Sequence, residues 1–389
     1  MDETPVLIVG SGPAGAATAL ELVRLNPGWA KNITILDKAG FPRKKICGGG
    51  LTPYALKWLD AMFASQWPPA ELDIQPVEEA RIRYENNAFA YFGDPVLQIV
   101  ERKYFDNWLL EKVKLAGVNV LQGETVTEAS VDEQGAVVST DNGAWKADLL
   151  VGADGANSII RRSLGLHGFG KMARLLERIT RPPEGVPFHK NRRAVFDFTP
   201  MSEGLQGYYW DFPTITGGEQ MMNRGMFDSA VHTHSGGYSL KKQLQKLLGD
   251  SSQEMGNSGS NEGHPIYRFA PGYKPYSHRA LLVGDAAGSD PFLGEGIAFA
   301  LHYGSAAAEA IDTAFKRNTF GMEVYDSVIR RHYVLSQLWT RYKIARLGYG
   351  LKNRAALKLI WKAAPWIMGW QAKRNPTTVP LSDKRMYRL

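Results

Sequence analysis

The fold is decided near the N-terminus by the stretch Val6-Leu7-Ile8-Val9-Gly10-Ser11-Gly12-Pro13-Ala14-Gly15. Its apolar start predicts a buried strand, and the small residues from Ala16 to Leu22 predict a helix directly after the glycine turn. Gly10 permits the tight turn, Gly12 lets the backbone approach a pyrophosphate, and Gly15 lets the helix pack closely on the strand. The pyrophosphate would lie at the positive end of that helix.

A second predicted strand, Ile33 to Leu36, ends at Asp37, whose carboxylate is placed to accept hydrogen bonds from an adenosine ribose. The separation of 27 residues from Gly10 exceeds the usual spacing of about 20, because residues 26–32 form a loop insert. A glycine fingerprint alone is weak evidence and could be an ordinary turn. Here the strand, the helix, the second strand and the terminal acid occur in order, so we predict a dinucleotide site.

Two later stretches also join an apolar strand to a Gly/Asp turn. They are Val151-Gly152-Ala153-Asp154-Gly155, a motif that closes with Arg161, and Leu281-Leu282-Val283-Gly284-Asp285. They resemble the Asp-Gly and Gly-Asp motifs of the flavoprotein monooxygenase superfamily, which has the fold of para-hydroxybenzoate hydroxylase. The resemblance implies that the dinucleotide is FAD, that Asp285 binds its ribityl chain and that the Asp154-Gly155 segment supports the pyrophosphate region. Arg102 matches the arginine that precedes a helix and reaches FAD in that superfamily.

Three further stretches are similar to the geranylgeranyl reductase family. They are the cysteine-glycine loop from Phe41 to Leu51, the segment Gly207-Tyr208-Tyr209-Trp210-Asp211-Phe212-Pro213, and the segment Asp290-Pro291-Phe292-Leu293-Gly294-Glu295-Gly296-Ile297. The second matches the Tyr-x-Trp-x-Phe-Pro motif that lines the prenyl cavity beside the flavin in that family. The resemblance implies that the protein saturates double bonds of a polyprenyl lipid or prenylated precursor. A hydride would come from reduced FAD, and a proton would go to the other carbon.

The physical chemistry of these stretches agrees with that interpretation. Gly294 and Gly296 let the backbone touch the flavin ring, and a helix starting at Ile297 would favour the anionic reduced flavin. The side chains of Tyr208, Tyr209, Trp210 and Phe212 would suit a prenyl chain, although alternation of this kind along a strand is also typical of ordinary sheet packing. Cys47 is either a small buried hydrophobe or, beside Arg43, Lys44 and Lys45, a favoured thiolate that acts in catalysis or positions substrate. Glu295 is either a proton donor or an anchor of the flavin loop.

These motifs give two sets of candidate residues. The expected catalytic neighbourhood is Cys47, Tyr208, Trp210, Phe212, Gly294, Glu295 and Gly296. The expected cofactor-binding residues are Gly10, Gly12, Pro13, Ala14, Gly15, Asp37, Lys38, Arg43, Cys47, Gly48, Arg102, Asp154, Gly155, Gly284, Asp285, Pro291, Gly294, Gly296 and Ile297. No metal site is expected, because the segment His232-Thr233-His234 has no carboxylate or cysteine set beside it.

Other flavin chemistries stay open from the sequence. Halogenases of this fold carry a Trp-x-Trp-x-Ile-Pro motif, from which this chain departs at Tyr208 and Phe212. A hydroxylase acting on an apolar or aromatic molecule is harder to dismiss, and a flavin-binding electron-transfer or scaffold protein is a third alternative. No second strand-glycine-helix unit is visible, so the electron donor is either NAD(P)H that binds transiently or reduced ferredoxin.

The expected fold class is α/β, with a Rossmann-like FAD-binding domain, a β-sheet substrate domain and a C-terminal helical region, as in para-hydroxybenzoate hydroxylase. The FAD-binding domain is predicted over residues 1–78, 99–170 and 276–321, and the substrate domain over residues 79–98 and 171–275. Residues 322–389 form the basic helical region, and residues 251–263 are expected to form a flexible surface loop.

Charge is divided unevenly along the chain. The totals are 46 Lys and Arg against 39 Asp and Glu, a net charge of +7, but residues 330–389 hold 14 cations and one acid, for a net charge of +13. The first 329 residues therefore carry a net charge of −6. This asymmetry predicts a negatively charged partner for the C-terminal region, either an anionic membrane surface or an acidic electron carrier, and argues against nucleic acid.

The location expected from the sequence is the cytoplasm, with peripheral membrane association through the C-terminal region. No cleaved signal and no apolar window of about 18 residues is visible, and the single cysteine excludes a disulfide within the chain. Aromatic residues of the C-terminal region would lie at the lipid headgroups, unless the region is an ordinary solvated helical cap. They are Trp339, Tyr342, Trp361, Trp366 and Trp370.

Overall fold

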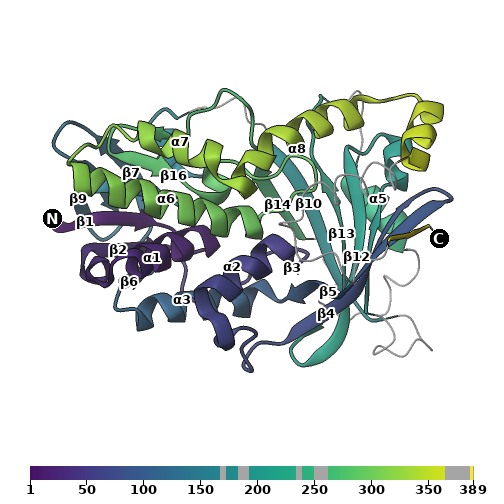
Figure 1. The fold of residues 1–389 in the computed structure, drawn as a ribbon, viewed down its shortest axis with the longest axis horizontal. Coiled ribbons are helices and arrows are strands. Elements are labelled where there is room, and N and C mark those ends of the chain that lie inside the picture. The colour runs from purple at the N-terminus through teal and green to yellow at the C-terminus, as the bar shows by residue number, and fades with distance from the viewer. Residues whose placement is uncertain (167–171, 183–191, 234–238, 249–261, 364–385, 389) are drawn as a thin grey trace. The chain divides into compact units, whose positions relative to one another are not determined.

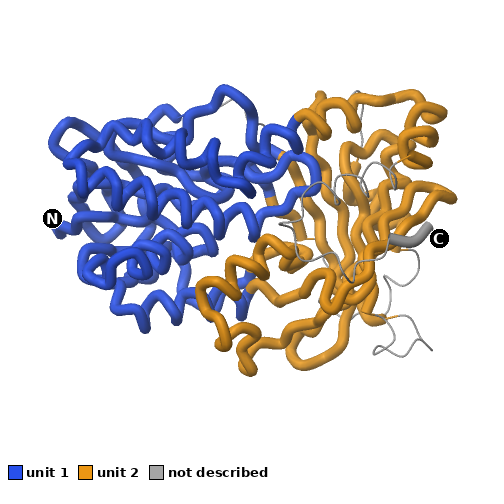
Figure 2. The backbone as a smooth tube through the Cα atoms, in the orientation of Figure 1, with its two compact units in different colours: residues 1–44, 103–172, 265–342 blue, residues 45–102, 173–264, 343–389 orange. Residues whose placement is uncertain are grey.

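The computed structural model describes residues 1–166, 172–182, 192–233, 239–248, 262–363 and 386–388. The chain forms two compact units, which Figure 2 distinguishes by colour. Unit 1 contains residues 1–44, 103–172 and 265–342, and unit 2 contains residues 45–102, 173–264 and 343–389. Much of the predicted loop at 251–263 and the C-terminal tryptophans Trp366 and Trp370 lie outside the described residues.

These units differ from the predicted domain division at several boundaries, of which two involve long segments. Residues 45–78 belong to unit 2, because strand β3 (Gly50–Leu51) pairs with β5 (Asn87–Val100), and β4 (Ile74–Tyr84) pairs with β5 along its length. Residues 322–342 belong to unit 1, where Tyr325 is fully buried and donates a hydrogen bond to the Leu282 carbonyl at 2.8 Å.

Unit 1 is built on a sheet with the strand order β15-β16-β9-β1-β2-β6 (Figure 1). Its parallel strands are β1 (Asp2–Val9), β2 (Ile33–Asp37), β6 (Asn119–Gln122), β9 (Ala144–Gly152) and β16 (Ala280–Leu282). The antiparallel additions are β7 (Val126–Val131), β8 (Ala136–Thr140) and β15 (Tyr276–Ser277). The run Val6 to Ile8 has no exposed side chain, which explains why this strand reads as continuously apolar rather than alternating.

The helices of unit 1 are α1 (Pro13–Leu25), α3 (Arg102–Leu115), α4 (Ile159–Ser163), α6 (Ile297–Arg317), α7 (Glu323–Arg331) and the first part of α8 (Tyr333–Gly350). Helices α1 and α6 approach closely at Gly304, where an added Cβ would lie 2.5 Å from the Ala17 Cβ. The predicted loop insert at 26–32 instead forms a 3-10 helix, η1 (Pro27–Asn32). It forms because the Asn26 side chain accepts a hydrogen bond from the Gly28 amide at 2.9 Å and caps it.

Unit 2 is built on a second sheet, with the strand order β14-β10-β13-β12-β11-β4-β5-β17 and β3 paired to β5. Its remaining strands are β10 (Met172–Thr180), β11 (Arg193–Asp197), β12 (Gly207–Thr216), β13 (Glu219–Asp228), β14 (Glu262–Tyr267) and β17 (Met386–Arg388). Its helical elements are α2 (Pro53–Phe63), η2 (Ala64–Gln66), η4 (Thr199–Glu203), α5 (Leu240–Leu248), the end of α8 and residues 354–363. Strands β11 and β12 lie in the part of the chain for which a β-sheet domain was predicted.

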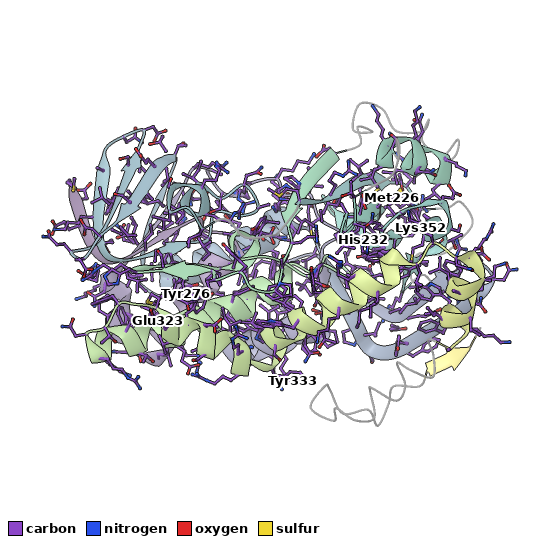
Figure 3. The ribbon with its side chains drawn as sticks, turned by 90° about the horizontal axis from the view of Figure 1, so that it is seen from above. Met226, His232, Tyr276, Glu323, Tyr333 and Lys352 are labelled. Atoms are coloured by element: carbon purple, nitrogen blue, oxygen red, sulfur yellow. The ribbon has the colours of Figure 1, made fainter. Side chains whose placement is uncertain are left out.

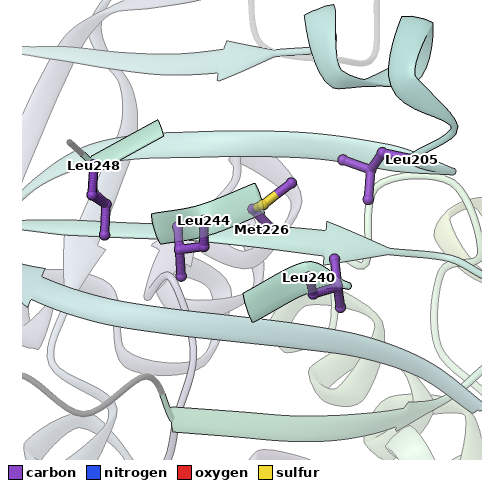
Figure 4. Close-up of a cluster of buried hydrophobic side chains, with 5 residues drawn as sticks. All are labelled: Leu205, Met226, Leu240, Leu244 and Leu248. Atoms are coloured by element: carbon purple, nitrogen blue, oxygen red, sulfur yellow. The ribbon is translucent and has the colours of Figure 1, made fainter. Parts of the chain in front are cut away.

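One face of the unit 2 sheet is closed by α5. Leu240, Leu244 and Leu248 recur every fourth residue and pack against Leu205 and Met226 (Figure 4). The predicted aromatic site residues Tyr208, Trp210 and Phe212 lie at alternate positions of β12 and face the opposite side of the sheet. None of the helices in the described ranges is long and apolar enough to cross a bilayer.

Candidate active site

The three glycine motifs follow three adjacent parallel strands of unit 1. Strand β9 lies in the middle, and its Gly152 is in register with Val9 of β1 on one side and with Leu282 of β16 on the other. The first motif starts at Gly10, the second continues from Gly152, and the third follows Leu282. Because parallel strands place their carboxyl ends at one sheet edge, the three motifs meet where open α/β sheets bind ligands.

Neighbouring atoms lie too close to these glycines to leave room for a side chain. An added Cβ would lie 2.4 Å from the Ala153 oxygen at Gly10 and 2.0 Å from the Gly10 oxygen at Gly15. At Gly284 it would lie 2.8 Å from the Ala14 Cβ, so the third motif packs directly on α1. Helix α1 begins at Gly12 with no side-chain cap. Its first amides therefore suit the diphosphate of a dinucleotide, and the site fits FAD.

Asp37 holds the first glycine turn closed. One carboxylate oxygen accepts hydrogen bonds from the Ser11 amide at 2.7 Å and the Ser11 hydroxyl at 2.6 Å. The other oxygen accepts one from the Ala39 amide at 2.9 Å, which leaves it acceptor capacity for a ribose hydroxyl. The adjacent Lys38 is exposed.

Arg43 lies beside the glycine turn. Its guanidinium is 3.5 Å from the Asp106 carboxylate and 4.8 Å from the centre of the Phe41 ring, and its Nη2 atom would lie 3.4 Å from a Cβ added at Gly12. Asp106, on α3, is fully buried and was missed at the sequence level, because nothing in its local stretch distinguishes it from a surface acid. Arg102, the arginine expected to reach FAD, is the buried first residue of α3. It is assigned to unit 2, as the last residue of the segment 45–102.

The second motif is linked to the third by Arg161. Asp154 caps α4 by accepting hydrogen bonds from the amides of Ile159 at 2.6 Å and Ile160 at 3.2 Å, and burial raises the pKa of its carboxyl. Arg161 donates to the Ala286 carbonyl at 3.0 Å, and its guanidinium lies 3.8 Å from the centre of the Tyr267 ring. The sequence marked Arg161 only as the end of a motif, without a role.

The third motif is stabilised by internal hydrogen bonds. Asp285 accepts one from the Ser289 hydroxyl at 2.5 Å, and its Oδ1 atom would lie 3.7 Å from a Cβ added at Gly296. The expected ribityl-binding acid and the expected flavin loop are thus neighbours within unit 1. Pro291 is buried in that loop, and α6 begins at Ile297 as predicted, with Gly296 as an N-cap that offers no side chain.

The loop between Asp290 and Gly296 is pinned by an arginine from α8. Arg341 lies 2.6 Å from the Asp290 carboxylate and 2.9 Å from the Glu295 carboxylate. Asp290 also accepts hydrogen bonds from the amides of Phe292 at 2.8 Å and Leu293 at 3.1 Å. No sequence motif marks Arg341, which lies 46 residues after Glu295 in the basic C-terminal region.

In unit 2, the Cys47 main chain is held by side chains from two strands. The Cys47 amide donates to the Glu177 carboxylate of β10 at 2.7 Å, and the Cys47 carbonyl accepts from the Asn223 side chain of β13 at 3.0 Å. Asn223 in turn accepts from the Trp210 indole at 2.8 Å. The Cys47 sulfur accepts from the Gly49 amide at 3.4 Å. Glu177 and Asn223 lie more than a hundred residues away in the sequence, which is why motif reasoning missed them.

The loop residues after Cys47 lie directly on aromatic rings. A Cβ added at Gly48 would lie 3.2 Å from the Phe212 ring and 3.4 Å from the Trp210 indole nitrogen. Gly49 has a φ of +72°, and its added Cβ would lie 2.1 Å from the Val100 oxygen. Both positions therefore need glycine for different reasons, one for ring contact and one for conformation.

The predicted aromatic residues form a row along one face of β12. Tyr208, Trp210 and Phe212 are buried, with successive ring centroids 6.4 Å apart at both steps. Phe198 extends the row, with its centroid 5.2 Å from that of Tyr208. We call these four residues the aromatic row. Tyr209 was predicted with them but packs against the α5 cluster, because alternate residues of a strand face opposite sides.

The cations expected to activate Cys47 have partners of their own. Arg43 pairs with Asp106 within unit 1, and the Lys45 amine hydrogen-bonds the His264 ring within unit 2. Activation of the thiol by these cations stays a prediction.

The fold and the converging glycine motifs define a dinucleotide-binding flavoprotein. A family model described as an FAD binding domain matches residues 3–234, which is more than half of the chain, so the chain belongs to this family. The protein is an FAD-dependent oxidoreductase, as the sequence predicted.

The resemblance to geranylgeranyl reductases is confirmed by the curated relatives. A menaquinone reductase of Mycolicibacterium smegmatis is 26% identical over 99% of this chain and 91% of its own length. A chloroplastic geranylgeranyl diphosphate reductase of Oryza sativa is 26% identical over 87% of this chain and 73% of its own. A digeranylgeranylglycerophospholipid reductase of Methanosphaera stadtmanae is 25% identical over 88% of this chain and 85% of its own.

Solved structures confirm the predicted fold. A geranylgeranyl bacteriochlorophyll reductase-like protein of Thermoplasma acidophilum superposes with a TM-score of 0.74 at 21% identity, covering 92% of this chain and 91% of its own. A variant of the halogenase PltM in complex with FAD gives a TM-score of 0.71 at 18% identity, covering 94% and 80%. The fold is therefore that of the para-hydroxybenzoate hydroxylase-like flavoproteins.

Proposed function

We propose that this protein reduces carbon–carbon double bonds of a polyprenyl lipid or prenylated precursor. The observation that carries the proposal is the Cys47 loop of unit 2, where a Cβ added at Gly48 would lie 3.2 Å from the Phe212 ring and 3.4 Å from the Trp210 indole nitrogen. An apolar row under a polar, cysteine-bearing loop suits a substrate that is a hydrocarbon chain with one reacting position. The relatives named as reductases of geranylgeranyl diphosphate and of a digeranylgeranyl lipid support the same substrate class.

The residues of unit 1 would hold FAD in parts. The first turn of α1 after Gly12 would bind the diphosphate, Asp37 the adenosine ribose and Asp285 the ribityl chain. The first turn of α6, which begins without a side-chain cap, would offer amides to the flavin ring. FAD, when bound and reduced, supplies the hydride. NAD(P)H and reduced ferredoxin both remain proposed electron donors.

Two residues of the candidate catalytic set receive distinct roles. Glu295 is proposed as an anchor of the flavin loop, because its carboxylate is ion-paired with Arg341 and its side chain is only 9% exposed. Cys47 is proposed to position the substrate or deliver the proton. Its amide and carbonyl are both held by hydrogen bonds to side chains, and its sulfur accepts a hydrogen bond from the Gly49 amide. The rings of the aromatic row would exclude water from the reacting chain.

The test is anaerobic reoxidation of the photoreduced flavin by a prenyl lipid and by its fully saturated analogue. We expect reoxidation with the olefin alone, and slower reoxidation in Trp210→Phe, which loses the hydrogen bond to Asn223. Tyr209→Phe is the matched control on the opposite face of the same strand. Reoxidation that ignores the olefin would indicate an electron-transfer protein, and turnover that requires oxygen and leaks peroxide would indicate a hydroxylase.

A further inference from the structure

Exposed aliphatic side chains gather at the C-terminal end of the described chain. Leu347, near the end of α8, is 74% exposed, and Leu359 and Ile360, on the helix at 354–363, are 69% and 45% exposed. Ile344 on α8 is 37% exposed. Elsewhere in the described part of unit 2, Leu247 on α5 is the large hydrophobic side chain of this kind, at 41%. Exposed aliphatic residues this close together along the chain fit an interaction surface better than a scatter of single residues.

The same segment carries positive charge without acids. Residues 343–363 contain six cations and no Asp or Glu, and they are Lys343, Arg346, Lys352, Arg354, Lys358 and Lys362. An ordinary solvated helix carries both signs of charge, whereas exposed aliphatic residues flanked only by cations match an anionic lipid surface.

The helix at 354–363 is fixed to unit 2 by its opposite side. The Glu85 carboxylate lies 2.7 Å from the Arg354 guanidinium and 3.0 Å from the Lys358 amine. The Trp361 ring stacks on Tyr84, with centroids 5.5 Å apart and an interplanar angle of 5°. Positions 354, 358 and 361 share one helix face, so the neighbouring Leu359 and Ile360 project on the far side.

The end of α8 is held in a similar way. The His232 ring hydrogen-bonds the Arg346 carbonyl at 2.8 Å, and a Cβ added at Gly350 would lie 3.0 Å from the same ring nitrogen. Figure 3 shows His232 and the exposed Lys352 close to this end of the helix. Both segments that carry the aliphatic residues therefore rest on unit 2 through specific contacts.

Two of the tryptophans expected at the lipid headgroups, Trp339 and Trp361, are half-buried and contact other rings of the protein. Trp361 points inward, with its centroid 4.7 Å from that of Phe198, the last ring of the aromatic row. Trp339 packs against Phe269 in unit 1, at a centroid distance of 4.8 Å. The aliphatic residues that are most exposed in this segment, Leu347 and Leu359, were not singled out by the sequence.

We propose that Leu347, Leu359 and Ile360 insert into an anionic lipid surface, with Lys352 and Lys362 on its headgroups. We call these five residues the lipid-facing surface. Arg354 and Lys358 are not part of it, because Glu85 already pairs with them. The inference rests on the proposed function in naming the source of the substrate, since a prenyl lipid partitions into membranes. Trp361 of the helix at 354–363 also contacts Phe198 of the aromatic row. The same helix therefore carries two residues of the lipid-facing surface that are proposed to insert, Leu359 and Ile360, and a contact to the proposed substrate row.

The test is co-sedimentation of the full-length, FAD-loaded protein with vesicles of phosphatidylcholine mixed with phosphatidylglycerol, and with vesicles of phosphatidylcholine alone. We expect binding to the anionic vesicles that weakens with salt. Replacing both Leu359→Ser and Ile360→Ser should lower the partition coefficient about tenfold, because two inserting side chains are lost. Leu247→Ser, an exposed leucine of the same unit, is the matched control and should change nothing.

Charge variants separate lipid from an acidic protein partner. Lys352→Glu with Lys362→Glu should weaken anionic vesicle binding, whereas Lys241→Glu with Lys242→Glu on α5 should not. Equal binding of the serine variants and the wild type would overturn the proposal. A second result would also overturn it: the wild type binds no vesicles, and the Lys352→Glu, Lys362→Glu variant loses binding to an acidic electron carrier.

A detergent assay separates this inference from the proposed function. With a prenyl lipid solubilised in detergent, the serine variants should turn over like the wild type, since the lipid-facing surface lies outside the candidate catalytic set. If the wild type saturates no prenyl lipid but still binds anionic vesicles, the proposed function fails and the lipid-facing surface stands.

Discussion

The two units hold their candidate site residues in different ways. In unit 1, main chain touches main chain: Gly15 meets Gly10, and Gly10 meets Ala153. In unit 2, side chains hold a main-chain loop, with Glu177 and Asn223 bonded to either side of Cys47. We therefore expect the glycine turns of unit 1 to be disrupted by the addition of one methyl group, and the Cys47 loop to be released by the loss of one hydrogen-bonding side chain.

The largest effect should come from Gly15→Ala, which tests the main-chain half of the comparison. The new Cβ would lie 2.0 Å from the Gly10 oxygen, so the turn and α1 must separate. We expect loss of bound FAD and a free energy of unfolding lowered by about 3 kcal/mol or more. FAD absorbance per protein and thermal unfolding measure both. Gly40→Ala is the control, because its Cβ meets nothing within 4 Å, and normal FAD content in Gly15→Ala would contradict the account.

Arg341→Met shows how far unit 1 also depends on side chains. The substitution leaves the Asp290 and Glu295 carboxylates, whose side chains are 0% and 9% exposed, without their shared cation. We expect a loss of about 3–5 kcal/mol in unfolding free energy and a shifted flavin spectrum. Lys316→Met breaks an ion pair whose lysine is 72% exposed and should cost no more than about 1 kcal/mol. Equal effects in the two variants would show that the Arg341 contacts are ordinary surface pairs.

Asn223→Leu tests the side-chain half. It removes the acceptor of the Trp210 indole and the donor to the Cys47 carbonyl, so the loop is released from β13. We expect kcat to fall about tenfold or more while FAD content stays normal. Asn223→Asp, which keeps the acceptor and loses the donor, should lie between that variant and the wild type. The control Asn142→Leu changes an exposed asparagine, and unaltered kcat in Asn223→Leu would remove the loop from the mechanism.

The smallest effect concerns pH and the packing of α7 against α6 in unit 1. Burial lowers the pKa of His332, partly offset by Glu309 and Glu21, and its ring centroid is 5.0 Å from that of His302. Between its lowered pKa and the ordinary value of about 6.5, the unfolded chain binds a proton that the folded chain does not. Stability should therefore fall as pH drops below about 6.5, by about 1.4 kcal/mol per unit of pKa difference, with no His332 contribution above that pH. Thermal unfolding of His332→Gln from pH 5 to 8 should show a weaker dependence than that of His278→Gln.

The same contrast explains what could be predicted from the sequence. Gly10, Gly152 and Gly284 signalled their roles locally, because a strand followed by a glycine turn dictates a backbone shape. Their convergence follows from parallel pairing of β1, β9 and β16. Asp106, Glu177, Asn223 and Arg341 gave no such signal, because each acts on a segment far away in the chain. Tyr209 belongs to the same aromatic motif but packs on the α5 side of β12, because alternate residues of a strand face opposite sides.

The central claim is tested most directly by mass spectrometry of prenyl lipids incubated with the anaerobically reduced enzyme. We expect products that gain two hydrogens per event and no oxygen, and less product from Asn223→Leu at equal FAD content. Products that contain added oxygen once air is admitted, with no hydrogenated product formed without air, would contradict it.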